Sequence, residues 1–187
     1  MADSDILNIV NENDEIVGVA AREEIHKSGL PHREVHVWFY TPNGEIIFQH
    51  RAKDKDTYPD LLDATVGGHV EIGDSYERTA IKETEEETGV IITEEDLIPI
   101  KKLQPTARRD AATGAINNAF KMQFAYLYKG DISDLVIEEG KIIGFETFPI
   151  QKLFNLQSPE KERFIPSITL PPLQEVFREI ERLLGKT

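Results

Sequence analysis

The segment spanning residues 68–90 constrains this chain more than any other part of the sequence. It reads GHVEIGDSYERTAIKETEEETGV and holds seven carboxylates against two basic residues. Asp74 and Glu77 stand at the spacing of a capping box, so a helix is expected to begin there. Gly89 is expected to end it, because glycine is favoured just past a helix terminus. The fold must therefore place an acidic helix between two loops that contain glycine.

Three glutamates of this helix, Glu83, Glu86 and Glu87, are expected to share one face, because residues three and four apart lie side by side. Like charges at that spacing destabilise a helix by roughly 0.2–0.5 kcal/mol per pair, and a bound cation would offset this. Mg²⁺ prefers carboxylate and water oxygens and is commonly shared with substrate phosphates. A solvated acidic helix face is the alternative interpretation of the same cluster.

The same segment resembles the Nudix box, G-x5-E-x7-R-E-U-x-E-E-x-G-U, where U is an aliphatic residue. The spacing is intact, and the box is matched by Gly68, Glu83, Glu86, Glu87, Gly89 and Val90. At the remaining positions, Asp74 stands for Glu, Lys82 for Arg and Thr84 for the aliphatic residue. The chain is therefore similar to the Nudix hydrolases over a motif far longer than a short glycine signature.

The resemblance implies a Mg²⁺-dependent hydrolase, with Mn²⁺ able to substitute, that cleaves a pyrophosphate bond in a nucleotide or a nucleoside diphosphate derivative. It implies that Glu83, Glu86 and Glu87 are the catalytic metal ligands, and that a backbone carbonyl of the Gly68 loop completes the coordination. Lys82 is implied to orient Glu83. A module that binds a nucleotide without cleaving it is a further alternative, but it would not need all three glutamates.

Residues outside the box are similar to the branch of the family that contains isopentenyl diphosphate isomerase and its hydrolase-like bacterial relatives. The similarity covers roughly residues 7–148 and is carried by His32, Trp38, Arg51, Ala52, Lys55, Pro59, Gly68 and His69. It implies that Arg51 and Lys55 bind the diphosphate, next to the loop residues Gly67, Gly68 and His69. Solvated charges at the end of a strand are the alternative for Arg51 and Lys55.

The isomerase activity itself is disfavoured. Gly67 occupies the position of the isomerase's catalytic cysteine, and the chain contains no cysteine. Asn117 and Ala119 stand where the isomerase has metal-binding glutamates. We therefore expect a hydrolase of this branch.

Several histidines remain without an assigned role. His26, His32 and His69 align with histidines that bind metal in the isomerase, and three imidazoles can bind a transition metal. The missing carboxylate partners argue against such a site, and support of the N-terminal segment is the alternative. His36 and Trp38 share a strand face with Glu34 and Tyr40 by period-two alternation, which leaves Trp38 as either a core residue or a base-stacking surface.

Hydrophobic patterning predicts an α+β fold, a Nudix-type α/β/α sandwich with a mixed central sheet, a box helix and a C-terminal helix. We expect a single domain over residues 1–187: a hairpin and short helix in 1–30, a core in 31–150 and a helical segment in 151–187. Strands are predicted at residues 6–10, 16–20, 35–40, 45–51, 97–103, 120–128 and 141–148, and helices at 21–27, from 74 to 89 and at 173–184. Substrate identity is expected to depend on the loops 53–62, 105–115 and 158–172.

Composition limits the partners. The net charge is −13, which argues against a nucleic acid polymer, since such binding depends on clustered Lys and Arg. No apolar run approaches the roughly 20 residues of a membrane span, and the first ten residues lack the pattern of a signal peptide. Together with the absence of cysteine, this favours a cytoplasmic protein that acts on a small-molecule diphosphate and does not enter a membrane. The oligomeric state is open, a homodimer included.

Overall fold

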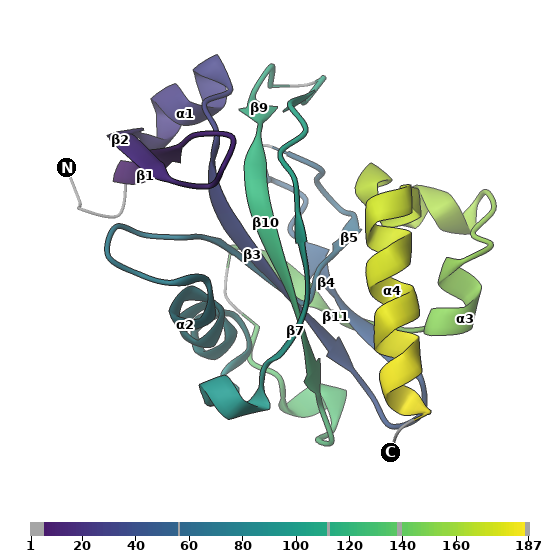
Figure 1. Ribbon diagram of the computed structural model, residues 1–187. Coiled ribbons are helices and arrows are strands. Elements are labelled where there is room, and N and C mark those ends of the chain that lie inside the picture. Colours follow the sequence, from purple (N-terminus) through teal and green to yellow (C-terminus); the bar gives the residue numbers. More distant parts are fainter. Residues whose placement is uncertain (1–5, 56, 112, 138–139, 186–187) are drawn as a thin grey trace.

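A mixed sheet of seven strands forms the centre of the computed structural model, which describes residues 6–55, 57–111, 113–137 and 140–185 (Figure 1). The main strand order is β11-β4-β3-β10-β7, while β5 pairs with β4 and β6 pairs with β3. β10 runs parallel to β3, and the other pairs are antiparallel. The bounds are β3 (His32–Tyr40), β4 (Glu45–Arg51), β5 (Leu62–Asp63), β6 (Val66–His69), β7 (Ile98–Leu103), β10 (Ala119–Leu127) and β11 (Ile142–Pro149).

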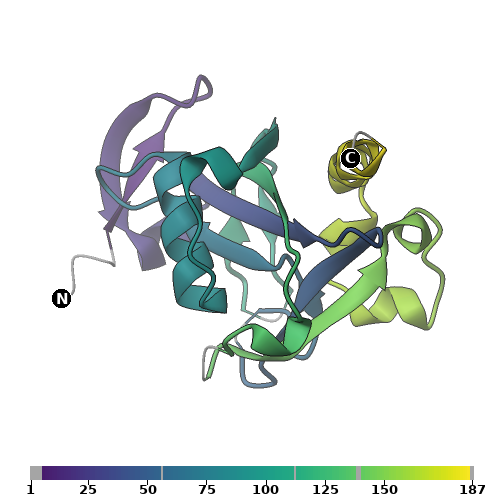
Figure 2. The ribbon, with the colours of Figure 1, turned by 90° about the horizontal axis from the view of Figure 1, so that it is seen from below.

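Helices cover both faces of this sheet, so the predicted sandwich is confirmed. The box helix α2 (Tyr76–Thr88) lies on one face, and α3 (Ile150–Leu153) and α4 (Pro171–Leu184) lie on the other (Figure 2). Alternation along β3 divides its side chains between two cores: Val35 packs in the cluster that contains Ala80 of α2, whereas Trp38 packs in the cluster that contains Phe177 of α4. Trp38 is fully buried, with its ring centroid 4.9 Å from that of Phe177. Trp38 is therefore a core residue and not a base-stacking surface.

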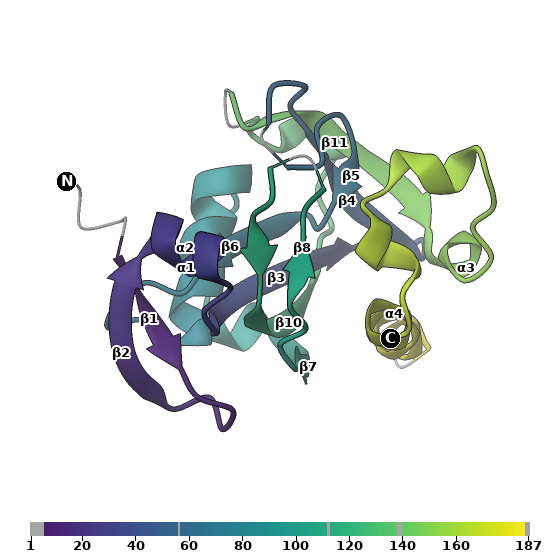
Figure 3. The same ribbon diagram turned by 90° about the horizontal axis from the view of Figure 1, so that it is seen from above.

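The N-terminal hairpin and first helix flank the box. β1 (Ile6–Val10) and β2 (Ile16–Ala21) form a separate ribbon, followed by α1 (Arg22–Ser28), which ends at Gly29 with a φ of 68° (Figure 3). Leu7 of β1 bridges to Glu71 of the box loop. This ribbon therefore contacts the box directly.

The turn of that hairpin is tied to the start of the box helix through Asp14. The Asp14 carboxylate accepts hydrogen bonds from Arg33 Nε at 2.6 Å, Lys102 Nζ at 2.6 Å and Tyr76 Oη at 3.0 Å. These three donors, two of them charged, hold the pKa of Asp14 below its usual value, although burial acts against them. Because Tyr76 is the first residue of α2, this network fixes the start of the box helix.

The expected loop 105–115 is partly wrong, because it contributes to a small hairpin of β8 (Arg108–Arg109) and β9 (Ile116–Asn117). Its turn is closed by Asp110, whose carboxylate accepts from the Thr113 amide at 2.8 Å. The remaining short elements are the 3-10 helices η2 (Glu94–Asp96), η3 (Ile132–Asp134), η4 (Glu160–Arg163) and η5 (Pro166–Thr169). Within the described ranges, no helix combines the length and apolar character needed to cross a membrane.

Candidate active site

The box helix begins and ends at specific caps. Ser75 is the N-cap, and its hydroxyl accepts a hydrogen bond from the Arg78 amide at 3.1 Å. Asp74, expected as the cap, instead forms an ion pair with Arg78 at 2.9 Å. Gly89 ends the helix with a φ of 72°, in the left-handed region that favours glycine. The predicted helix is thus confirmed, with its cap one residue later.

Glu83 lies against the backbone of the preceding glycine loop. A Cβ atom at Gly68 would collide with the Glu83 carboxylate, so this approach requires glycine. Burial, followed by the like charge of Glu86, raises the pKa of Glu83 to about 7. The carboxylate therefore occupies a place where negative charge is unfavourable unless a cation compensates it.

Glu87 is fixed by the same loop. Its Oε2 accepts a hydrogen bond from the amide of Gly67 at 3.1 Å, and the residue is buried. Glu86 is exposed on the helix surface. The structure thus brings Glu83 and Glu87 to the Gly67–Gly68 loop, with Glu86 one turn of helix from Glu83. Among the described residues, however, the three carboxylates do not form a group whose ligand atoms all lie within 4.8 Å of one another.

Lys82 contacts a different carboxylate from the expected one. Its Nζ donates to Glu71 Oε2 at 2.6 Å, which joins the box helix to the loop before it. Its charge acts on Glu83 across space and favours the ionised form. The implied orienting role of Lys82 remains a prediction, and the contact shown is one that holds the loop to the helix.

Arg51 fastens the loop that follows β4. Its guanidinium donates to the carbonyl of Thr57 at 2.7 Å, to that of Tyr58 at 3.2 Å and to Asp63 Oδ2 at 3.2 Å. Lys55 lies on that same loop and is partly buried. The structure therefore gives Arg51 a positioning role, and diphosphate binding by Arg51 and Lys55 remains a prediction.

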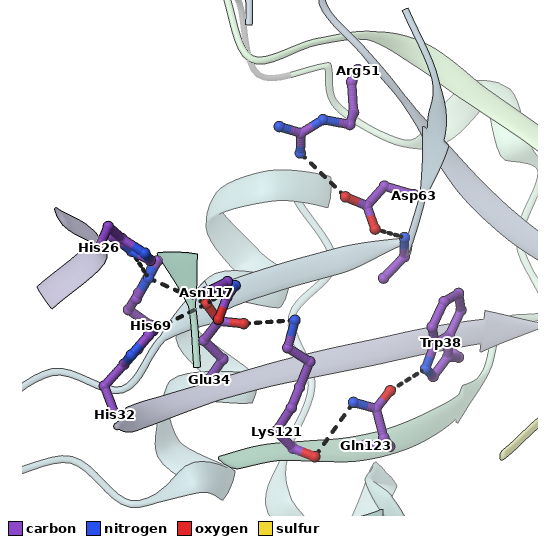
Figure 4. Close-up of polar contacts among 11 residues, drawn as sticks. His26, His32, Glu34, Trp38, Arg51, Asp63, His69, Asn117, Lys121 and Gln123 are labelled. Carbon is purple, nitrogen blue, oxygen red and sulfur yellow. Dashed lines mark hydrogen bonds and ion pairs between the residues drawn. The ribbon is translucent and has the colours of Figure 1, made fainter. Parts of the chain in front are cut away.

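His26, His32 and His69 come together although they belong to α1, β3 and β6. One ring nitrogen from each lies within 4.8 Å of the others, and the Nε2 atoms of His26 and His69 are 3.0 Å apart (Figure 4). Burial lowers the pKa of His69 to about 3, so this imidazole is neutral. Three imidazoles at these distances can hold a transition metal.

The sequence missed the carboxylate of this cluster. Glu34 Oε1 lies 3.3 Å from His32 Nε2 and 3.4 Å from His69 Nε2, and it accepts a hydrogen bond from Asn117 Nδ2 at 2.8 Å (Figure 4). The carboxylates that the isomerase carries at positions 117 and 119 are still absent, but Glu34, on the same strand as His32, lies beside the three histidines. Strand alternation had placed Glu34 on this face, but only the β3–β6 register, which pairs Glu34 with His69, shows the contact.

Comparison with known proteins settles the family. The family model of the NUDIX domain matches residues 30–168. This chain belongs to the Nudix family. It is similar to uncharacterised Nudix hydrolases from Streptomyces coelicolor, at 44% identity over 85 residues, and Clostridium acetobutylicum, at 27% over 155 residues. These alignments cover 46% and 81% of this chain.

The matched segments span 47% of the Streptomyces protein and 73% of the Clostridium protein. A crystal structure from Deinococcus radiodurans shares the fold with a TM-score of 0.69 at 21% identity, covering 93% of this chain and 98% of that one. The NUDIX domain of Shewanella oneidensis NrtR, complexed with ADP ribose, matches with a TM-score of 0.55 at 14% identity, covering 82% and 88%. The Nudix fold is therefore shared with structures whose sequences differ widely from this one.

Proposed function

We propose that this Nudix protein hydrolyses a pyrophosphate bond in a nucleotide or in a nucleoside diphosphate derivative, with Mg²⁺ as cofactor. The packing of Glu83 on Gly68 carries the proposal, because it places a carboxylate against a loop backbone where ionisation is unfavourable without a cation. Membership of a hydrolase family and the ADP ribose bound by the Shewanella domain support a nucleotide-derived substrate.

The residues present fit a hard divalent cation. Glu83 and Glu87 offer carboxylate oxygens beside the Gly67–Gly68 backbone, and Glu86 adds a third from the same helix. Oxygen ligands of this kind are those that Mg²⁺ prefers. When bound, the ion would lower the pKa of water and neutralise the charge of the leaving phosphate. The hydrogen bond from the Gly67 amide keeps Glu87 in place for this role, and Lys82 keeps the loop against the helix.

The isomerase alternative fits the structure poorly. A Cβ at Gly67 would lie 3.2 Å from Cδ2 of His36, so a cysteine there would press on the imidazole ring. Glycine also offers no nucleophile or proton donor. We therefore expect no conversion of isopentenyl diphosphate to dimethylallyl diphosphate.

A substrate panel tests the proposal. Nucleoside di- and triphosphates, dinucleoside polyphosphates, ADP-ribose and isopentenyl diphosphate would be incubated with Mg²⁺ or Mn²⁺, and released phosphate and nucleoside monophosphate would be measured. Glu86→Gln should lower the best rate by about a hundredfold or more, since a ligand charge is lost. Glu85→Gln, an exposed neighbour on the same helix, serves as the control and should retain the parent rate. Full activity of Glu86→Gln would show that the site is assigned wrongly.

A further inference from the structure

The face of β3 and β10 that carries Trp38 changes character along its length. The two strands are parallel and in register, so Glu34, His36 and Trp38 lie beside Lys121, Gln123 and Ala125 in that order. At the Trp38 end this face packs on α4 through Phe177. At the Glu34 end its side chains are polar, and Glu34 lies beside His69 of the box loop (Figure 4). The pairing of β3 with β6 also sets His36 opposite Gly67.

Lys121 lies at this polar end and forms an ion pair with Glu34. Its Nζ lies 2.6 Å from Glu34 Oε2, and its side chain is 23% exposed. Glu34 itself is buried, and Lys121 and the neighbouring histidines hold its pKa well below the usual value. An ammonium group has three donors. Glu34 is the one ion-pair partner of Lys121 within the described ranges, so donors remain that can point toward solvent.

The residues around Lys121 are held by hydrogen bonds and burial, while Lys121 itself stays partly exposed. Gln123 is fixed because its Oε1 accepts from Trp38 Nε1 at 2.8 Å. His36 is buried, and its Nδ1 has no hydrogen-bond partner among the described residues. Burial lowers the pKa of His36 well below its usual value, and the positive charges of Lys121 and Arg51 act in the same direction. Two strand spacings separate Lys121 from His69 across β3, a distance of about 10 Å.

The charge of the whole chain makes such a local cation significant. A molecule with a net charge of −13 repels an anionic ligand at long range, so binding requires cations positioned at the site. A lysine already held by a buried carboxylate loses little side-chain entropy on binding. The alternative is that Lys121 serves only to neutralise the buried Glu34 carboxylate. That role explains the ion pair, but it does not explain why part of the Lys121 side chain is exposed to solvent.

We propose that Lys121, positioned by Glu34, is a substrate-binding residue that receives an anionic phosphate group of the ligand beside the box loop. The proposal deepens the proposed function and rests on it for the nature of the ligand. The ligand class is a compound with at least two linked phosphates. Because the box helix lies on the opposite face of the sheet, such a ligand would reach Lys121 past the edge strand β6 at Gly67, whose amide contacts Glu87 and which pairs with His36. The apolar chain of a prenyl diphosphate would find no matching surface at the polar end of this face.

The test uses methylenediphosphonate, a diphosphate analogue that cannot be hydrolysed, with Mg²⁺, and measures its Kd for the 187-residue chain by calorimetry. Lys121→Met should weaken binding about tenfold or more, because a charge-assisted hydrogen bond is lost. Lys121→Arg should bind within a few-fold of the parent. Lys101→Met, which breaks an exposed ion pair with Glu175 on another part of the surface, is the matched control and should leave the Kd unchanged.

The double variant Glu34→Gln/Lys121→Met distinguishes a role of Lys121 in ligand binding from a role in stabilising the folded protein. It removes both charges of the pair, so its melting temperature should recover relative to Lys121→Met, while its affinity should stay low. Recovery of the affinity together with the stability would overturn the proposal, as would parental affinity of Lys121→Met or no binding by the parent at millimolar ligand. Because the measurement needs no turnover, an inactive parent would contradict the proposed hydrolysis without deciding the role of Lys121.

Discussion

At the scale of single residues, Glu83 occupies a place where its negative charge is unfavourable in the absence of a cation. Its oxygens are confined between the Gly68 backbone and the charge of Glu86, and the metal-free protein carries the cost. Glu87, the residue after Glu86, instead receives a backbone hydrogen bond that satisfies it. Two glutamates that the sequence treats alike therefore have different environments.

This difference predicts a pH dependence of stability. The pKa of Glu83 is about 7 in the folded metal-free protein and 4.5 as its ordinary value. Between these values the folded state keeps a proton that the unfolded chain has lost, so the free energy of unfolding falls as the pH rises through this window. Above pH 7 the full cost is present, on the order of 2 kcal/mol for a side chain partly reached by water, or a few degrees in melting temperature.

Thermal unfolding in EDTA from pH 5 to pH 8 checks this. The melting temperature of Glu83→Gln relative to that of the parent should rise with pH, whereas the difference between Glu85→Gln and the parent should stay nearly flat. A parent and a Glu83→Gln variant with parallel pH profiles would contradict the raised pKa.

At the scale of elements, the glycine loop and the box helix act as one unit. Gly68→Ala would add a methyl group where the Glu83 carboxylate lies, and the flexible side chain would move while the backbone stays. We expect a change in melting temperature of only a few degrees but a loss of activity of about tenfold or more, because misplacing a catalytic group by about 1 Å can be that costly.

The matched control for that substitution is Gly18→Ala in β2, where a Cβ would meet nothing closer than Ile9 Cδ1 at 4.0 Å. It should change neither property. A fully active Gly68→Ala protein would show that the contact between Glu83 and the loop is unimportant for the reaction.

The elements also show what the sequence could predict. The box helix, the hairpin of β3 and β4 and the amphipathic α4 are long enough for their periodicity and caps to identify them. β5, β8 and β9 have two residues each, too few for any pattern. Contacts that depend on register could not be predicted from the sequence. Antiparallel pairing of β3 and β6 joins Glu34 with His69, and parallel pairing of β3 and β10 joins Glu34 with Lys121, which lies 87 positions further along the chain.

At the scale of the whole molecule, cation binding should be visible in global stability. A ligand that binds the folded state and not the unfolded chain stabilises it by RT ln(1 + [L]/Kd), about 2.7 kcal/mol at 100 times Kd. For a chain of 187 residues this corresponds to roughly 5–10 °C in melting temperature. Mg²⁺ should therefore raise the melting temperature of the parent, and Glu86→Gln should show a much smaller rise.

Ionic strength is the control. A solvated acidic surface would respond to Na⁺ at matched ionic strength as strongly as to Mg²⁺. Equal shifts in the two salts, or an unchanged Mg²⁺ shift in Glu86→Gln, would favour the surface interpretation of the glutamates over a metal site.

The division of the β3–β10 face has a consequence for how such a protein can diversify. Its apolar half packs on α4, while its polar half lies beside Gly67 and His69 of β6. The box glutamates belong to a separate helix on the opposite face of the sheet. If Lys121 binds the ligand as proposed, substitutions at positions 34 and 121 should alter ligand preference while the box helix and the packing of α4 stay unchanged.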